Sequence, residues 1–137
     1  MKKTQVTTVT LMCLILLLST NCRAKTHVII VNDLGEGIEL TVHCKSKDDD
    51  LGLHKLPFKE LYEFSFKPNI LWPATLFYCS FEWGNELRSF NIYDEKRDYQ
   101  VCHDKCYWNV YKAGPCLIIN DPDVTRCQDW KGNDKES

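Results

Sequence analysis

Six cysteines dominate the chain beyond residue 24, and their chemistry is the first question that the sequence raises. They are Cys44, Cys79, Cys102, Cys106, Cys116 and Cys127. Cysteines can hold zinc, act as nucleophiles or pair into disulfides. Cys102 and Cys106 are four residues apart, and no second cysteine or histidine pair completes a familiar zinc spacing. An even number of cysteines in a small chain favours three disulfides, although the sequence does not choose the pairing.

The other residues with chemical potential are four histidines and one acidic run. The histidines are His27, His43, His54 and His103. Acid–base catalysis would require two of them at one site, and no sequence motif indicates such a pair. No Gly-x-Ser-x-Gly sequence marks a serine nucleophile. The consecutive acids at 48–50, followed by Leu51 and Gly52, do not have the alternating oxygens of a calcium loop. We therefore predict no catalytic residue, no metal and no cofactor.

The N-terminus has the pattern of a secretory signal peptide. Lys2 and Lys3 form a basic start, residues 11–18 are almost wholly apolar, and Ala24 supplies a small residue for cleavage. A membrane span needs roughly 20 apolar residues. We expect residues 1–24 to be cleaved, the mature chain to be secreted, and no segment to insert into a membrane.

Cleavage would also make the chain more acidic. It removes Lys2, Lys3 and Arg23 but no acidic residue, so the formal net charge falls from −2 to −5. This balance argues against nucleic-acid binding. Residues 25–137 suit one small domain, which buries only about 65% of its unfolded surface. Disulfides would therefore be a useful source of stability.

Alternating apolar and polar residues predict short strands, and turn-forming residues separate them. The expected strands cover 27–31, 38–44, 62–66, 76–83, 90–92, 106–110 and 116–119. We expect the first two to form a hairpin across a loop with Gly35 and Gly37, and 76–83 to pair back with 90–92 through Gly84-Asn85. The pattern predicts an all-β fold, a small antiparallel β-sandwich of seven or eight strands, with a polar tail from about residue 120.

The four tryptophans fall into two groups. Trp83 and Trp108 are in register with apolar neighbours, which indicates core positions. Trp72 and Trp130 lie in a loop and in the tail, so we expect them to be exposed and available for contact. Exposed aromatic side chains could also line a sugar-binding face.

Several sequence blocks resemble the plant self-incompatibility S1 family, also called S-protein homologues. The most specific is Val-His-Cys-Lys-Ser-Lys-Asp-Asp-Asp-Leu-Gly at 42–52. Others follow in the family's order, at 64–67, 76–83, 90–93, 97–98, 106–110 and 114–116. The resemblance covers roughly residues 27–119. It implies a small secreted plant protein, delivered to the apoplast, with a β-sandwich held by disulfides.

The resemblance also implies a function. Founding members of this family are stigma ligands that bind a pollen-surface protein and trigger rejection of self pollen in poppy. By that likeness we expect a non-enzymatic extracellular ligand for a cell-surface receptor. A carbohydrate-binding module of the apoplast is the alternative, and a secreted hydrolase is a third reading. Unlike some members, this chain has no Asn-x-Ser/Thr sequence, so we expect no N-glycosylation.

Exposure alone suggests the contact residues of such a ligand, because loops on a rigid sandwich often carry recognition. The candidates lie in the charged stretch at 45–52, in the 71–74 loop and in the 82–86 turn. They are Lys45, Lys47, Asp48, Asp49, Asp50, Trp72 and Asn85. The oligomeric state cannot be predicted from these features.

Overall fold

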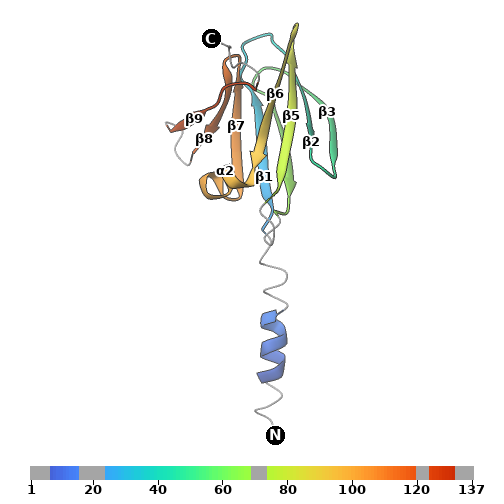
Figure 1. The fold of residues 1–137 in the computed structure, drawn as a ribbon, viewed down its shortest axis with the longest axis vertical. Coiled ribbons are helices and arrows are strands. Elements are labelled where there is room, and N and C mark those ends of the chain that lie inside the picture. Colours follow the sequence, from blue (N-terminus) through green and yellow to red (C-terminus); the bar gives the residue numbers. More distant parts are fainter. Residues whose placement is uncertain (1–6, 16–23, 69–73, 120–123, 132–137) are drawn as a thin grey trace.

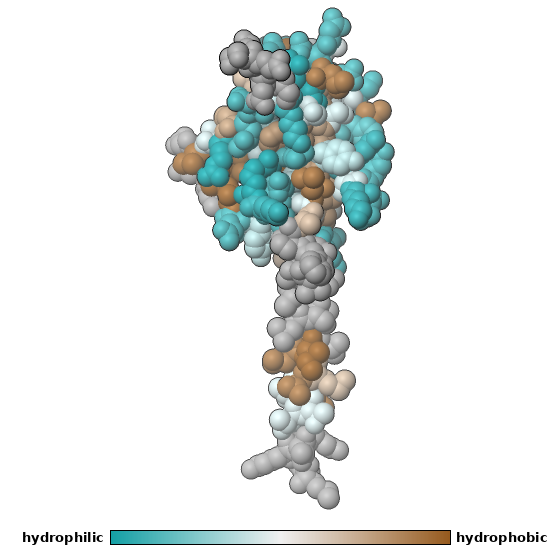
Figure 2. Space-filling view, viewed as in Figure 1, coloured by the Kyte–Doolittle hydropathy of each residue, from teal (hydrophilic) through white to brown (hydrophobic). Residues whose placement is uncertain are grey.

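The computed structural model describes residues 7–15, 24–68, 74–119 and 124–131. Residues 7–15 form a helix with exposed side chains that lies away from the folded domain (Figure 1). Hydrophobic side chains cover much of this helix (Figure 2). Within the described ranges, no helix has the length and apolar character needed to cross a membrane. Cleavage after residue 24 stays a prediction.

In the described residues, nine strands form two sheets (Figure 1). The five-stranded sheet has the order β4-β1-β7-β8-β9, and the four-stranded sheet has the order β3-β2-β5-β6. Their bounds are β1 Thr26–Asn32, β2 Leu40–Lys45, β3 Asp50–Leu56, β4 Leu61–Phe66, β5 Leu76–Trp83, β6 Glu86–Asp94, β7 Lys105–Tyr111, β8 Gly114–Ile118 and β9 Thr125–Cys127. The predicted disulfide-stabilised all-β sandwich is confirmed, with more strands than expected.

The alternating pattern correctly assigned the faces of the strands. In β2, Leu40, Val42 and Cys44 are fully buried, whereas the residues between them are partly exposed. β5 repeats this pattern and lies inside its sheet, between β2 and β6. The predicted hairpin of β5 and β6 is also present, and Gly84 takes a positive φ of 53° in its turn. Alternation succeeds here because one face of each strand packs on the core.

The predicted hairpin between the first two strands is wrong. β1 belongs to the five-stranded sheet, where it runs antiparallel to β4 and parallel to β7. β2 lies in the other sheet, so residues 33–39 cross from one sheet to the other. A hairpin and a crossing both place turn-forming residues between two strands, so local pattern cannot distinguish them. The β1–β7 pair also makes the five-stranded sheet mixed instead of wholly antiparallel.

Asn32 holds this crossing in place from a fully buried position. Its Nδ2 donates to the backbone oxygens of Ile38 and Leu56, at 2.7 and 2.8 Å. Its Oδ1 accepts from the Leu34 amide at 3.0 Å. One buried side chain thereby satisfies backbone groups at both ends of the crossing.

The C-terminal part belongs to the fold, which corrects two predictions. Trp83 and Trp108 are buried as expected, but Trp130 is also buried, with 2% of its surface exposed. Its ring lies 5.2 Å from that of Phe81 and 5.7 Å from that of Trp83. Its Nε1 donates to the Lys112 carbonyl oxygen at 2.9 Å. The stretch beyond 120 therefore includes β9 and a core tryptophan, not only a polar tail.

The six cysteines form three disulfides. Cys44–Cys79 joins register partners on β2 and β5, and Cys116–Cys127 joins register partners on β8 and β9. Cys102–Cys106 joins the helix α2 (Glu95–Cys102) to β7. Each sheet thus has a cross-strand disulfide, and the third fixes the helix.

Candidate functional site

The charged stretch at 45–52 forms a tight hairpin instead of a long loop. Lys45 ends β2 and Asp50 begins β3, so only residues 46–49 form the turn. The Ser46 amide donates to the Asp49 carbonyl oxygen at 2.8 Å, and the Asp49 amide donates to Ser46 Oγ at 3.1 Å. The turn is therefore short and closed by two hydrogen bonds between Ser46 and Asp49.

The three consecutive aspartates have different surroundings. Asp50 contacts His43 Nε2 at 2.5 Å and Lys45 Nζ at 3.9 Å, and its Oδ1 accepts from the Gly52 amide at 3.0 Å. The hydrogen bond from the Gly52 backbone, followed by that of His43, lowers the pKa of Asp50 below its usual value. Asp48 and Asp49 make no ion pair with any described residue. Asp50 therefore holds the hairpin, and the other two carboxylates face solvent.

A groove of about 590 Å³ lies beside this turn. Its walls are residues 46–49, Phe66 and Lys67 at the end of β4, and residues 74–78 at the start of β5. Because β4 and β5 belong to different sheets, the groove opens where the two sheets part at one end of the sandwich. Phe66 and Tyr78 bring aromatic surface to it. Charged groups of the turn thus border a partly apolar recess.

The predicted contact residues do not form one surface. Lys45, Lys47 and the aspartates lie in or next to the 46–49 turn, and of these Lys47, Asp48 and Asp49 line the groove. Asn85 is exposed in the turn between β5 and β6, at the far end of the eight-residue strand β5, about 26 Å away along the strand. Trp72 lies outside the described residues.

Three of the four histidines contact different neighbours. His27 Nδ1 contacts Glu63 Oε1 at 2.9 Å, and the ring of His54 stacks on Tyr62 with 3.7 Å between ring centres. His43 contacts Asp50, as described above. None of them lines the groove. The groove beside the 46–49 turn therefore holds no histidine pair.

The helix α2 was not predicted from the sequence. It is short, with eight residues, and the Asp94 side chain caps it by accepting from the Lys96 amide at 3.1 Å. An aspartate before a glutamate-led turn is a recognisable start signal. Because the residues just before Asp94 follow a strand pattern, the sequence alone did not reveal the start of this helix.

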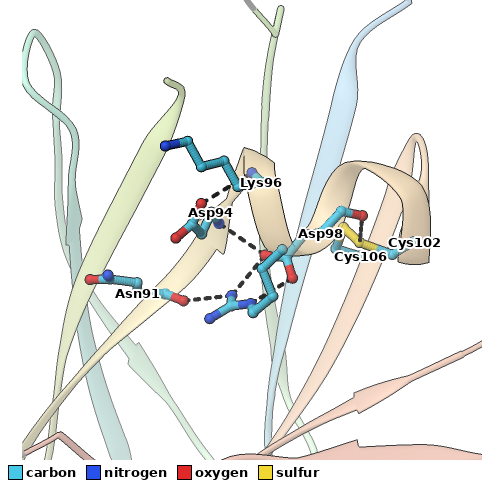
Figure 3. A network of polar contacts seen from close by, with 7 residues as sticks. Asn91, Asp94, Lys96, Asp98, Cys102 and Cys106 are labelled. Atoms are coloured by element: carbon cyan, nitrogen blue, oxygen red, sulfur yellow. Dashed lines mark hydrogen bonds and ion pairs between the residues drawn. A yellow bond between two sulfur atoms is a disulfide. The ribbon is translucent and has the colours of Figure 1, made fainter. Parts of the chain in front are cut away.

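The Arg97-Asp98 block of the family resemblance forms a network under this helix (Figure 3). Arg97 contacts both carboxylate oxygens of Asp98 and donates to the Asn91 carbonyl oxygen, each at 2.7 Å. Asp98 also accepts from the Asp94 amide at 2.9 Å. Asp98 is 1% exposed. The network attaches α2 to β6, so this block serves the fold and not an open site.

Together these features define a small β-sandwich with three disulfides and a charged turn beside an end groove. The family model described as plant self-incompatibility protein S1 matches residues 27–130. The chain belongs to this family.

Curated relatives agree with this assignment. S-protein homolog 5 of Arabidopsis thaliana is 47% identical over 104 residues, covering 76% of this chain and 77% of the relative. S-protein homolog 4 of the same plant is 42% identical over 113 residues, covering 80% and 74%.

A solved structure has the same fold. It matches with a TM-score of 0.60 at 19% identity, over 79% of this chain and 96% of the other. It is described as an SPH (self-incompatibility protein homologue), one of a widespread family of small, highly stable, secreted plant proteins.

Proposed function

We propose that this chain is a secreted, non-enzymatic ligand that binds a cell-surface protein through the 46–49 turn and the adjoining groove. The observation that carries this proposal is that Lys47, Asp48 and Asp49, which line the same recess as Phe66 and Tyr78, make no ion pair with any residue that the structure describes. Charges not satisfied within the molecule can complement a partner, and aromatic surface supplies contact area. Asp50, already engaged with His43, is a scaffold residue in this proposal.

The family relationship supports this function. The matching family is named for plant self-incompatibility, a process of recognition between cells. The structural neighbour is described as secreted, and the N-terminal pattern of this chain predicts the same route, into the apoplast. A short, rigid turn also suits recognition, because little conformational entropy is lost when it binds.

Binding to isolated plant plasma membranes tests the proposal. We expect saturable binding of the secreted, oxidised protein, lost when Asp48 and Asp49 are both replaced by Ser. In the matched control, Ser replaces Glu36 and Glu39, two exposed acidic residues in the crossing before β2, at the opposite end of that strand from the turn. Both double variants lose the same charge. Equal binding by the two variants would refute a role for the 46–49 turn.

A carbohydrate ligand is the second candidate, and the aromatic side chains of the groove favour it. Tyr78 is 44% exposed, and Phe66 also lines the groove. Retention on cell-wall polysaccharide without membrane binding would support this candidate. Loss of that retention in Tyr78→Ala would assign it to the groove.

A further inference from the structure

The disulfide between β8 and β9 differs from the other two in its exposure. Cys127 is exposed, as are all three residues of β9. In contrast, Cys44 and Cys79 are 0% and 1% exposed, and Cys102 and Cys106 are 7% and 0% exposed. A disulfide is reduced when a thiolate reaches one of its sulfur atoms, so access strongly affects the rate. The disulfide between β8 and β9 is therefore the most open of the three to a reductant.

This disulfide holds the beginning of a C-terminal strap, which we define as residues 125–131. β9 pairs with β8 at the outer edge of the five-stranded sheet (Figure 1). Just after β9, the Gln128 amide donates to the Pro115 carbonyl oxygen at 2.9 Å. The two segments pack closely here, because a Cβ added at Gly114 would overlap the Gln128 carbonyl oxygen. The first half of the strap thus lies against β8.

The end of the strap crosses to the other sheet. The Lys131 amide donates to the Ser89 carbonyl oxygen at 3.3 Å, and Lys131 Nζ donates to Asn91 Oδ1 at 2.6 Å, both on β6. β9 and β6 are edge strands of their sheets, so the strap bridges the two sheets along one side of the sandwich. On the opposite side, the edge strands β3 and β4 meet directly, where His54 stacks on Tyr62.

Trp130 lies between these two attachments and closes the core. Its buried ring packs on Phe81 and Trp83, and its Nε1 donates to the Lys112 carbonyl oxygen, as described above. Phe81 and Trp83 would lose this cover if the strap moved away. One exposed disulfide therefore holds a strap whose tryptophan covers two core aromatic residues.

We propose that Cys116–Cys127 is a thiol-exchange site, at which a dithiol reductant releases this strap. A thiolate of the reductant attacks Cys127 Sγ, and the electron pair of the S–S bond leaves on Cys116 Sγ, which takes up a proton. The second thiolate of the reductant then attacks the reductant's own sulfur in the mixed disulfide and releases the Cys127 thiolate, which is protonated in turn. The protein gains two electrons and two protons, and the dithiol is oxidised to a disulfide.

Reduction at this site loosens the strap and leaves the sandwich folded. Cys44–Cys79 still joins β2 to β5, and Cys102–Cys106 still joins α2 to β7. A segment held by few buried contacts opens by itself more easily than the whole domain unfolds. Loss of a link that closes 11 residues should make opening of the strap about a hundredfold more frequent. The open form exposes the rings of Phe81, Trp83 and Trp130.

Graded reduction tests which disulfide reacts first. The secreted, oxidised protein is treated with dithiothreitol, its thiols are alkylated at successive times, and the labelled cysteines are identified by peptide mass spectrometry. We expect Cys116 and Cys127 to be labelled at least about tenfold faster than the other four cysteines. Labelling of Cys102 and Cys106 at an equal or higher rate would overturn the proposal.

Hydrogen exchange tests the release of the strap. The amides of Gln128 and Lys131 should exchange about a hundredfold faster once Cys116–Cys127 is selectively reduced, and reoxidation should restore slow exchange. Unchanged exchange after selective reduction would overturn the proposal.

Two double variants provide a matched comparison without reductant. Cys116→Ala/Cys127→Ala should show the fast exchange of the strap, whereas Cys102→Ala/Cys106→Ala should keep it slow. Equal exchange in the two variants would also contradict the proposal. The strap packs on Phe81 and Trp83, at the end of β5 that lies away from the groove. Binding through the 46–49 turn therefore does not depend on this result.

Discussion

Arg97 and Asp98 are neighbours in the chain, yet their side chains form a two-point contact with both distances at 2.7 Å. The guanidinium also lies over the rings of Phe90 and Trp108, at 4.9 and 5.2 Å from their centres. This pair therefore connects α2 to the aromatic core. The Arg97-Asp98 block of the family resemblance thus has a structural role.

Removing the charge of Asp98 should destabilise the fold. Asp98→Asn keeps the shape but leaves the partly buried Arg97 without its carboxylate, and we expect a loss of about 2–4 kcal/mol in the free energy of unfolding. Urea unfolding measures it. Lys96→Ala, an exposed position in the same helix, should stay within about 0.5 kcal/mol of the parent. Equal values for the two variants would contradict the structural role.

The three disulfides should differ in their contribution to stability. They close separations of 35, 11 and 4 residues, for Cys44–Cys79, Cys116–Cys127 and Cys102–Cys106. Loop-closure entropy gives about 4, 3 and 2 kcal/mol in that order. The ranking is tested by replacing both cysteines of one disulfide at a time by Ala and measuring the free energy of unfolding of each variant in denaturant. The opposite order would show that packing around the sulfur atoms outweighs the chain-entropy effect.

The acid sensitivity of the β2–β3 hairpin should depend on Asp50. Its pKa is lower in the folded state than the usual 3.8. The stabilisation is therefore present above that value and is lost as the pH falls through the lower folded pKa. Amide exchange in the hairpin, followed from pH 5 downward, should lose this dependence in Asp50→Asn. Asp48→Ser/Asp49→Ser should retain it, and a loss there would contradict the assignment.

Tyr93 should ionise at a higher pH than an ordinary tyrosine. Burial, followed by the nearby carboxylates of Glu95 and Asp98, raises the pKa of Tyr93 to about 12. In the unfolded chain a tyrosine ionises near 10. The unfolded state therefore releases this proton first, and stability should fall as the pH rises from 10 toward 12. Phenolate absorbance should show a late step that is missing in Tyr93→Phe. A late step that persists in that variant would assign it to another tyrosine.

The sequence by itself determined which side of most strands is buried. In β2 and β5 the alternation places Val42, Cys79 and Phe81 inward, and the structure agrees. The cysteine number indicated a disulfide-stabilised domain, and the ordered blocks at 42–52 and 76–83 indicated the family. These are local signals, because each is written within a few consecutive residues.

Only the tertiary structure decided which strands are neighbours. Alternation indicates that Phe64 and Val42 are buried, but not that they lie in different sheets. Pairing, crossing and disulfide connectivity depend on contacts between distant segments, such as β1 with β7. The burial of Trp130 and the different environments of Asp48 and Asp50 have the same origin. Each follows from what the rest of the chain places beside the residue, which no local pattern contains.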